Sequence, residues 1–274
     1  KRANGGDIVV IRASGADGYN DYFYTDLGVP VNSVETIVTT SLAAALDPYV
    51  EDKIRKAEGL WIAGGDQFNY VSFWKNNVIE DAINYLINDK NAVVGGTSAG
   101  MAIQGQAYFD AANGSVTSAS ALANPYNSQV SIGYNDFLNT PILQNVITDT
   151  HYNSPDRKGR HVTFMARMMQ DFGLNAKGIA CNEYVSVCID TNNIARVYGE
   201  YPAYPDEIAF FIQVNCVLPN TPEQCSTGVA LNWQRNNEAL KVYKVPGTIT
   251  GDYTFDLNDW LSGTGGTWEN WFVN

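Results

Sequence analysis

The chain has 274 residues, of which 45% are hydrophobic and 17% are charged, which is the composition of a globular protein and not of a disordered one. The formal net charge of −12 argues against nucleic acid as a partner, because binding to phosphate needs a basic face. An acidic surface can attract a cationic substrate, but from the charge alone the better explanation is that it keeps the protein soluble.

The first half of the chain alternates strand and helix patterns. The predicted strands are 7–12, 33–39, 60–63 and 92–95, and the predicted helices are 19–27, 47–57 and a long helical stretch from 67 to about 88. This order predicts the α/β class, with a doubly wound, mostly parallel sheet and helices on both faces. Active sites in such sheets lie at the carboxyl ends of the strands.

In the second half of the chain, the sequence predicts a long surface segment, one helix and many strands. The surface segment covers 110–141, a strand follows at 145–148, and an amphipathic helix covers 157–171. Short strands are predicted over 178–198, and the pattern from 206 onward is β-rich. We predict an α/β core over residues 1–200 and a β-rich extension over 201–274, which forms either an added sheet edge or a small appendage within the same domain.

Four cysteines form two close pairs along the chain, Cys181 with Cys188 and Cys216 with Cys225. Their spacings do not suggest a zinc site, and no histidine lies near either pair. We expect two local disulfides and therefore an oxidising compartment, secreted or periplasmic; the alternative is four reduced thiols. No apolar run reaches the length of a membrane span, and no signal peptide is visible, which suggests that a leader was removed or omitted.

A candidate nucleophile follows the fourth predicted strand. Residues 96–100 read G-T-S-A-G and match G-x-S-x-G between a strand and a helical stretch, which is the context that gives this motif meaning. The small flanking residues permit a sharp turn that projects the hydroxyl of Ser98 above the sheet. The sequence therefore predicts Ser98 as the nucleophile of a hydrolase. The alternative is a glycine-rich turn in which the serine only caps a helix.

A nucleophilic serine needs a base, and the chain has only two histidines. His151 follows the predicted strand 145–148 and would lie at its carboxyl end, which makes it the better base. His161 lies inside the predicted helix 157–171, so we expect it to be a packing or surface residue. The chain has no further histidine that could take the part of the base.

The third member of such a triad is an acid that orients the imidazole. Glu183 follows the strand pattern G-I-A-C-N and would again lie at a strand end. Asp149 and Glu200 are weaker rivals for this role. The resulting order of serine, histidine and acid differs from the order that is usual in α/β-hydrolases.

Four segments together resemble a known family. G-L-W-I-A-G-G-D-Q, V-V-G-G-T-S-A-G-M, D-T-H-Y-N-S-P-D-R-K-G-R and G-I-A-C-N-E-Y look like the cyanophycinase and aspartyl dipeptidase (peptidase E) family of serine peptidases, especially its secreted cyanophycinase-like members. The resemblance runs from about residue 7 to 190. It implies a sheet similar to that of glutamine amidotransferases, no metal or organic cofactor, a peptide substrate and a homodimer.

The resemblance also implies roles for individual residues. Ser98, His151 and Glu183 would form the triad, and the backbone N–H groups of Gly65 and Ala99 would form the oxyanion hole. Four more residues match substrate-binding positions of the family: Gln67, Asp149, Arg157 and Arg160. For the two arginines, the alternative is a solvated helix start.

Three departures from the family pattern bear on specificity. Pro155 stands where the family has the first of three arginines, and Thr150 replaces a common glutamine. These two changes leave specificity for cyanophycin open. The sequence also begins later than the family pattern, which suggests truncation, processing or a strand supplied by another chain.

The predicted function is a serine peptidase that hydrolyses aspartyl peptide bonds, including release of β-Asp-Arg from cyanophycin, through an acyl-enzyme. One alternative is a related amidase, esterase or aspartyl dipeptidase with another substrate. The other is a binding protein without catalysis on the same scaffold.

Overall fold

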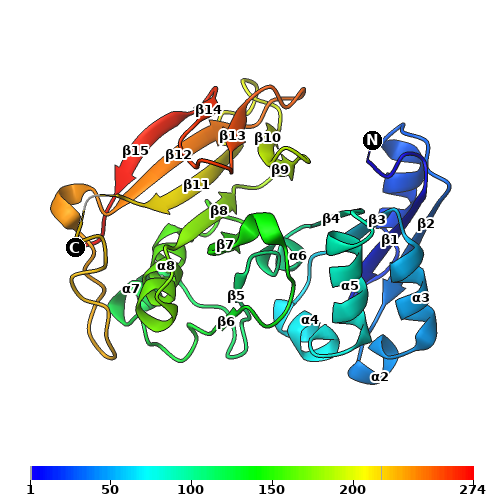
Figure 1. The fold of residues 1–274 in the computed structure, drawn as a ribbon, viewed down its shortest axis with the longest axis horizontal. Helices are drawn as coiled ribbons and strands as arrows, with labels where there is room; N and C mark the ends of the chain where they lie inside the picture. The colour runs from blue at the N-terminus through cyan, green and yellow to red at the C-terminus, as the bar shows by residue number, and fades with distance from the viewer. Residues whose placement is uncertain (1, 217) are drawn as a thin grey trace. The chain divides into compact units, whose positions relative to one another are not determined.

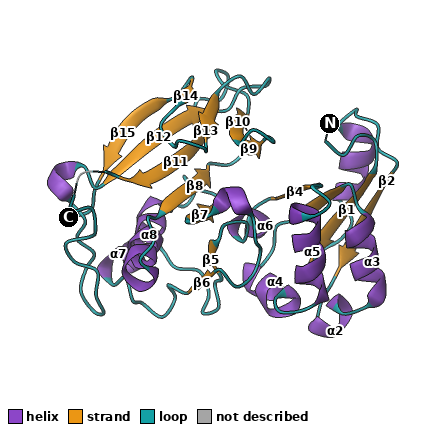
Figure 2. Cartoon of the chain, viewed as in Figure 1, coloured by secondary structure: helices purple, strands orange, loops and turns teal. Residues whose placement is uncertain are grey.

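The computed structural model describes residues 2–216 and 218–274, which divide into two compact units (Figures 1 and 2). The first unit holds the residues up to Ala112 together with Gly133–Leu143. The second unit holds Asn113–Ile132 and Gln144–Asn274.

A parallel sheet of four strands is the centre of the first unit. Its strands are β1 (Asp7–Arg12), β2 (Ser33–Val38), β3 (Gly59–Ile62) and β4 (Val93–Gly96), in the order β2-β1-β3-β4. All three strand pairs are parallel, and Leu60 of β3 lies opposite Val9 on one side and Val94 on the other. The predicted parallel sheet is therefore confirmed, and the carboxyl ends of its strands share one edge.

Helices cover both faces of this sheet. They are α1 (Tyr19–Asp21), the π-helix η1 (Tyr22–Asp26), α2 (Leu42–Ala45), α3 (Pro48–Lys56), α4 (Gln67–Trp74), α5 (Val78–Asn88) and α6 (Ala99–Ala102). On one face, Ile62 belongs to the same buried core as Ile54 of α3 and Ile83 of α5, and Figure 1 shows these two helices side by side. The neighbouring side chain, Trp61, contacts Phe23 of η1 at 5.7 Å between ring centroids. Because successive strand residues point to opposite faces, η1 covers the other face.

Two predicted helices differ from the observed ones. The predicted stretch from 67 to 88 is interrupted by Asn76, whose φ of 58° is left-handed, and Asn77 then starts α5 by accepting a hydrogen bond from the Ile79 N–H at 3.0 Å. Asparagine tolerates the left-handed region better than most residues and is a favoured helix cap, so the break has a local cause. The predicted helix 19–27 is mostly a π-helix.

A mixed sheet is the centre of the second unit. β7 (Val146–Asp149) pairs in parallel with β8 (Lys177–Cys181), and α8 (Lys158–Phe172) connects them. The sheet continues with three antiparallel neighbours, β11 (Ile208–Val214), β12 (Leu240–Pro246) and β15 (Thr267–Trp271). Strands from both sides of residue 200 thus belong to one sheet, in which β11 pairs with β8.

Another sheet, in which all strand pairs are antiparallel, packs on this mixed sheet. Its strands are β9 (Ser186–Ile189), β10 (Ile194–Tyr198), β13 (Thr254–Asp256) and β14 (Gly263–Thr264), in the order β14-β13-β10-β9. Phe255 of β13 stacks on Phe211 of β11 at 4.4 Å and on Tyr243 of β12 at 5.3 Å. The remaining elements are short: β5 (Ala107–Phe109), α7 (Ser118–Ala123), β6 (Ile132–Tyr134), η2 (Pro141–Leu143) and η3 (Arg235–Asn237).

The four cysteines are free thiols, so the predicted disulfides are not confirmed. Cys181 is buried at the end of β8, and burial raises the pKa of its thiol to about 12. At neutral pH this side chain therefore stays a protonated, poorly nucleophilic thiol. In the described part of the chain, no helix is long and apolar enough to cross a membrane.

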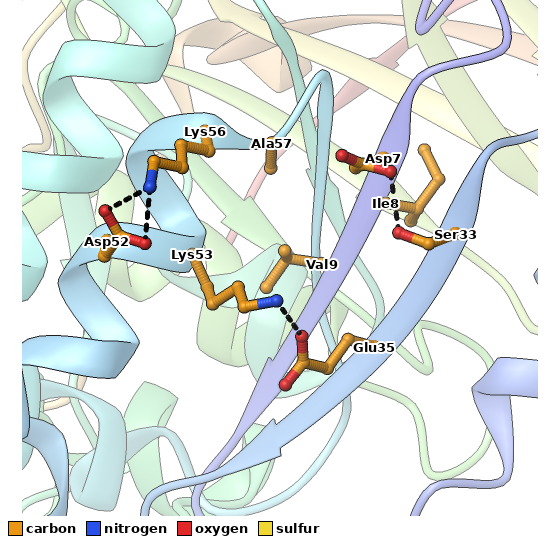
Figure 3. A pocket seen from close by; sticks show the side chains of 9 residues that line it. All are labelled: Asp7, Ile8, Val9, Ser33, Glu35, Asp52, Lys53, Lys56 and Ala57. Carbon is orange, nitrogen blue, oxygen red and sulfur yellow. Dashed lines mark hydrogen bonds and ion pairs between the residues drawn. The ribbon is translucent and has the colours of Figure 1, made fainter.

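A small hollow of about 150 Å³ lies at the amino ends of β1 and β2 (Figure 3). Lys53 forms an ion pair with Glu35 at 3.0 Å, and Lys56 forms one with Asp52 at 2.7 Å. Asp7 accepts hydrogen bonds from the side chains of Ser33 and Asn32, which lower its pKa. All five charged groups of the hollow are thus paired, and they lie at the end of the strands opposite to the carboxyl edge.

We predict that Thr39→Val destabilises the first unit. The Thr39 hydroxyl accepts a hydrogen bond at 2.8 Å from Nε1 of Trp74, whose side chain is fully buried. Valine keeps the shape but leaves this donor unpaired, so the free energy of unfolding should fall by about 1–3 kcal/mol. Urea denaturation followed by tryptophan fluorescence measures the change. The same substitution at exposed Thr250 should change stability by less than about 0.5 kcal/mol; equal losses would contradict the prediction.

Candidate functional site

Ser98 lies in a strained turn between β4 and α6. Its backbone has φ 52° and ψ −118°, a region that residues other than glycine rarely occupy. A Cβ on Gly100 would lie 2.0 Å from the Ile62 carbonyl oxygen, and one on Gly96 would lie 2.6 Å from the Gly100 carbonyl. The turn therefore requires both glycines of the motif. The Ser98 side chain does not cap α6, so the alternative of a purely capping serine gains no support.

The loop after β3 lies beside Ser98. A Cβ on Gly64 would be 3.3 Å from Cβ of Ser98, and the Tyr70 hydroxyl contacts the carbonyls of Ala63 and Gly64 at 2.9 and 3.0 Å. A Cβ on Gly65 would lie only 2.8 Å from the Tyr70 hydroxyl oxygen, so a larger residue would disturb this loop. Of the two predicted oxyanion residues, Gly65 thus belongs to a loop that packs against Ser98, and Ala99 follows Ser98 directly in the chain.

Gln67 is the first residue of α4 and already has a partner within the protein. Its Nε2 donates a hydrogen bond to the Phe109 carbonyl at 3.3 Å. Its side-chain carbonyl oxygen can still accept a hydrogen bond from a ligand, because an amide side chain has both donor and acceptor groups.

His151 and Glu183 follow two neighbouring parallel strands in the second unit. β7 ends at Asp149, which lies opposite Ala180 of β8, so the residues after both strands emerge at the same edge. The His151 Nδ1 and the Glu183 Oε1 lie 2.9 Å apart. An ionised carboxylate only accepts hydrogen bonds, so Nδ1 carries the proton in the neutral ring and Nε2 is the basic nitrogen. This is the arrangement expected of a base and its orienting acid.

Both residues are accessible, and the backbone around them is unusual. The side chains of His151 and Glu183 are 37% and 43% exposed. His151 has φ 49°, and Tyr184 has φ 61°. Left-handed backbone at non-glycine residues is often found at functional sites, where the surrounding structure holds it in place. Glu183, one of the three acids considered from the sequence, is bonded to His151.

Asp149 and Arg160 were both predicted to bind substrate, and the structure pairs them with each other. Arg160 Nε donates to Asp149 Oδ2 at 2.8 Å, and Nη2 donates to Oδ1. The two side chains are 3% and 2% exposed. Arg157 differs, because it is half-buried and donates one hydrogen bond, from Nη1 to the Thr150 carbonyl at 3.0 Å. Burial lowers the pKa of Arg157, and the charge of Arg160 adds to this effect.

His161 is a packing residue, as expected. It is fully buried in α8, its Nδ1 lies 3.1 Å from the Tyr152 hydroxyl, and its Nε2 lies 3.2 Å from the Ile147 carbonyl. The carbonyl can only accept, so Nε2 carries the proton and Nδ1 accepts from Tyr152. Burial lowers the pKa of His161, which keeps the ring neutral.

The predicted residues thus form two groups, one in each unit. The first unit holds Gly65, Gln67, Ser98 and Ala99, and the second holds Asp149, His151, Arg157, Arg160 and Glu183. Sequence reasoning gave no role to Tyr152, the residue after His151, whose hydroxyl is bonded to His161. Its position beside a predicted catalytic histidine was the available signal, although buried tyrosines are common in protein cores.

The buried imidazole of His161 generates a prediction about pH. Its pKa is lower in the folded than in the unfolded protein, where it is about 6.5, so its contribution to stability is complete above that pH and is lost as the pH falls below it. We expect the urea midpoint of the wild type to fall more steeply between pH 7.5 and 5.5 than that of His161→Gln, which cannot take up this proton. Parallel pH dependences of the two midpoints would contradict the assignment.

Comparison with known proteins places these residues in a family. The sequence model of Peptidase family S51 matches residues 16–194, and no curated protein matches the chain. Among solved structures, the chain is similar to the crystal structure of a peptidase from an acI-B1 Actinobacterium. The two sequences are 12% identical, the match covers 71% of this chain and 74% of that one, and the TM-score is 0.48. Since the family match covers more than half of the chain and includes Ser98, His151 and Glu183, the protein belongs to peptidase family S51, the serine peptidases of the cyanophycinase and peptidase E kind.

Proposed function

We propose that this serine peptidase is cyanophycinase-like and cleaves aspartyl peptide bonds with Ser98, His151 and Glu183 as its triad. The observation that carries the proposal is the 2.9 Å contact between His151 Nδ1 and Glu183 Oε1 at adjacent strand ends. The strained turn at Ser98, in the motif context of a nucleophile, gives independent support.

In the proposed reaction, the Ser98 hydroxyl attacks the carbonyl carbon of the substrate while His151 Nε2 takes its proton. A bond forms between Oγ and carbon, and the carbonyl oxygen becomes an oxyanion that accepts hydrogen bonds from the N–H groups of Gly65 and Ala99. One such donor contributes about 2.7–4 kcal/mol to stabilising the transition state. His151 then protonates the leaving amine, and the carbon–nitrogen bond breaks to leave an acyl-enzyme.

Water completes the cycle. His151 removes a proton from the attacking water, the second tetrahedral intermediate collapses, and Ser98 recovers its proton as the acid is released. Glu183 remains ionised throughout and stabilises the imidazolium that forms in each half-reaction. No step requires a group from outside the chain apart from substrate and water.

The preference for an acidic substrate rests on Arg157. Its guanidinium has one bond to the backbone, and no carboxylate partner is found for it among residues 2–216 and 218–274. A planar guanidinium can grip a carboxylate with two parallel hydrogen bonds. We therefore assign Arg157 to the free carboxylate of an aspartyl residue. Arg160 is less suited to this role, because its guanidinium already forms two hydrogen bonds with the Asp149 carboxylate.

We expect Ser98→Ala to lose hydrolysis of cyanophycin and of β-Asp-Arg dipeptide by about 10⁶-fold, the loss typical of removing a serine nucleophile. Mass spectrometry of released Asp-Arg measures the effect. Ser72→Ala is the matched control, because Ser72 is exposed on α4 and should leave the rate unchanged.

Other outcomes of this experiment separate the remaining alternatives. Labelling of Ser98 by a fluorophosphonate without cleavage of either substrate would keep a serine hydrolase and discard cyanophycin. Neither labelling nor cleavage would favour a binding protein without catalysis. Equal cleavage by wild type and Ser98→Ala would exclude Ser98 as the nucleophile.

We expect Arg157→Met to reduce kcat/KM for β-aspartyl substrates by about 10- to 100-fold, the equivalent of a lost hydrogen bond to a charged group. An analogue whose free carboxylate is replaced by an amide should lose less, because it forms no ion pair with Arg157 and only the lost hydrogen bond to the Thr150 carbonyl affects it. Steady-state kinetics on both substrates measures the difference. Arg196→Met removes an exposed arginine from β10 as a control. A uniform loss on both substrates would count against the assignment of Arg157.

A further inference from the structure

The loop that carries His151 needs support from its surroundings. β7 ends at Asp149, and His151 follows two residues later with a left-handed φ of 49°. Such a backbone conformation is unfavourable for a residue other than glycine, and it persists only where neighbouring contacts hold it in place. The contacts of residues 149–152 therefore decide how well the imidazole is placed.

The carboxylate of Asp149 holds this loop from inside the protein. Its Oδ1 accepts the Thr150 N–H at 2.8 Å, and its two oxygens accept Nε and Nη2 of Arg160. Three hydrogen bonds from the protein thus converge on one carboxylate that is 2% exposed. One of the three fixes the N–H of Thr150, the residue that directly precedes His151.

Arg160 connects this carboxylate to two other segments. Its Nη1 donates to the Ser115 hydroxyl at 3.2 Å, and its backbone N–H donates to the Ser118 hydroxyl at 3.2 Å. The guanidinium therefore links the end of β7, the first turn of α8 and the segment that leads into α7. Each of its three nitrogens is engaged within the second unit.

Two further contacts hold the same loop. Arg157 donates to the Thr150 carbonyl at 3.0 Å, and the Tyr152 N–H donates to the Cys181 carbonyl at 3.1 Å. Thr150 is thus bonded on both its N–H and its carbonyl, and Tyr152 ties the loop to the end of β8. Glu183, two residues after Cys181, is the partner of His151. The Asp149–Arg160 pair is the most deeply buried of these supports.

We propose that Asp149 and Arg160 are positioning residues, which fix His151 against Glu183, and that neither contacts the substrate. The proposal rests on the triad of the proposed function and deepens it. A substrate group could reach either side chain only by separating a buried, bidentate ion pair, which leaves the other charge unpaired in a buried place and is strongly unfavourable. The pair therefore acts on catalysis through the backbone of Thr150.

A double variant, Asp149→Leu with Arg160→Met, tests this role. Replacing both members by apolar residues of similar size avoids an unpaired buried charge and leaves the fold stable enough to measure. We expect kcat on β-Asp-Arg dipeptide to fall by about 100-fold, the loss typical of a misplaced catalytic group, and KM to stay within about threefold. Asp171→Asn is the matched control, because it removes another ion pair of α8, that of Arg167 with Asp171.

Arg160→Lys adds a second comparison. Lysine keeps the positive charge but cannot form the two parallel hydrogen bonds of a guanidinium. We expect it to lower kcat without raising KM, as the double variant does. A rise in KM of tenfold or more at unchanged kcat, in either protein, would overturn the proposal in favour of direct substrate binding.

A spectroscopic test works without any substrate. The two histidines carry opposite neutral tautomers, because His151 donates from Nδ1 to Glu183 while His161 donates from Nε2 to Ile147. Imidazole ¹⁵N spectra should therefore show one Nδ1–H ring and one Nε2–H ring in the wild type. In the double variant, the Nδ1–H ring should become a tautomer mixture, while His161 should keep its Nε2–H tautomer because its bonds to Tyr152 and Ile147 remain.

The two readouts separate this proposal from the proposed function. An unchanged His151 tautomer together with wild-type kcat in the double variant would overturn the positioning role. If the wild type neither cleaves the dipeptide nor reacts with a fluorophosphonate, the triad function fails, and the ¹⁵N spectra alone then decide whether Asp149 and Arg160 place the ring.

Discussion

The buried ion pair between Asp149 and Arg160 joins the elements on which the second half of the site depends. It ties the end of a parallel strand to the first turn of the helix that leads to the next strand, and its carboxylate holds the N–H of Thr150, the residue before His151. A buried pair adds little to stability when compared with apolar residues of the same size. Its value here is geometric, because two parallel hydrogen bonds allow only one orientation of the carboxylate.

The predicted site residues of the first unit are held in a different way. Ser98 is held by close backbone packing, since neither Gly96 nor Gly100 leaves room for a Cβ beside the end of β3. The adjacent loop of Gly64 and Gly65 is fixed by the hydroxyl of Tyr70, which itself stacks on Trp74 at 4.3 Å. The turn of Ser98 therefore depends on glycines that allow close backbone packing, whereas the loop of His151 depends on a pair of charged side chains.

Much of the fold around Ser98 and His151 could be predicted from the sequence, because the residue patterns that indicate it lie within short segments. The strand–turn–helix around Ser98 follows from glycine spacing, and the place of His151 after a strand follows from a short apolar run. The break at Asn76 was missed because a single left-handed asparagine barely disturbs the apolar periodicity. The pairing of β11 with β8 was also beyond the sequence, since nothing in either strand specifies a partner about 30 residues away.

The roles of the basic residues could not be separated from the sequence for a related reason. Arg157 and Arg160 lie three residues apart at the start of α8, where no acidic residue occupies the first turn and positive charge opposes the helix dipole. Only the fold brings Asp149 to Arg160, and that carboxylate compensates one of the two charges. Arg157 keeps its charge in a half-buried place with a single backbone acceptor. In the proposed function, a carboxylate that reaches Arg157 relieves an unfavourable interaction as well as forming a favourable one, so one arginine of this helix start orients Asp149 and the other favours an acidic substrate.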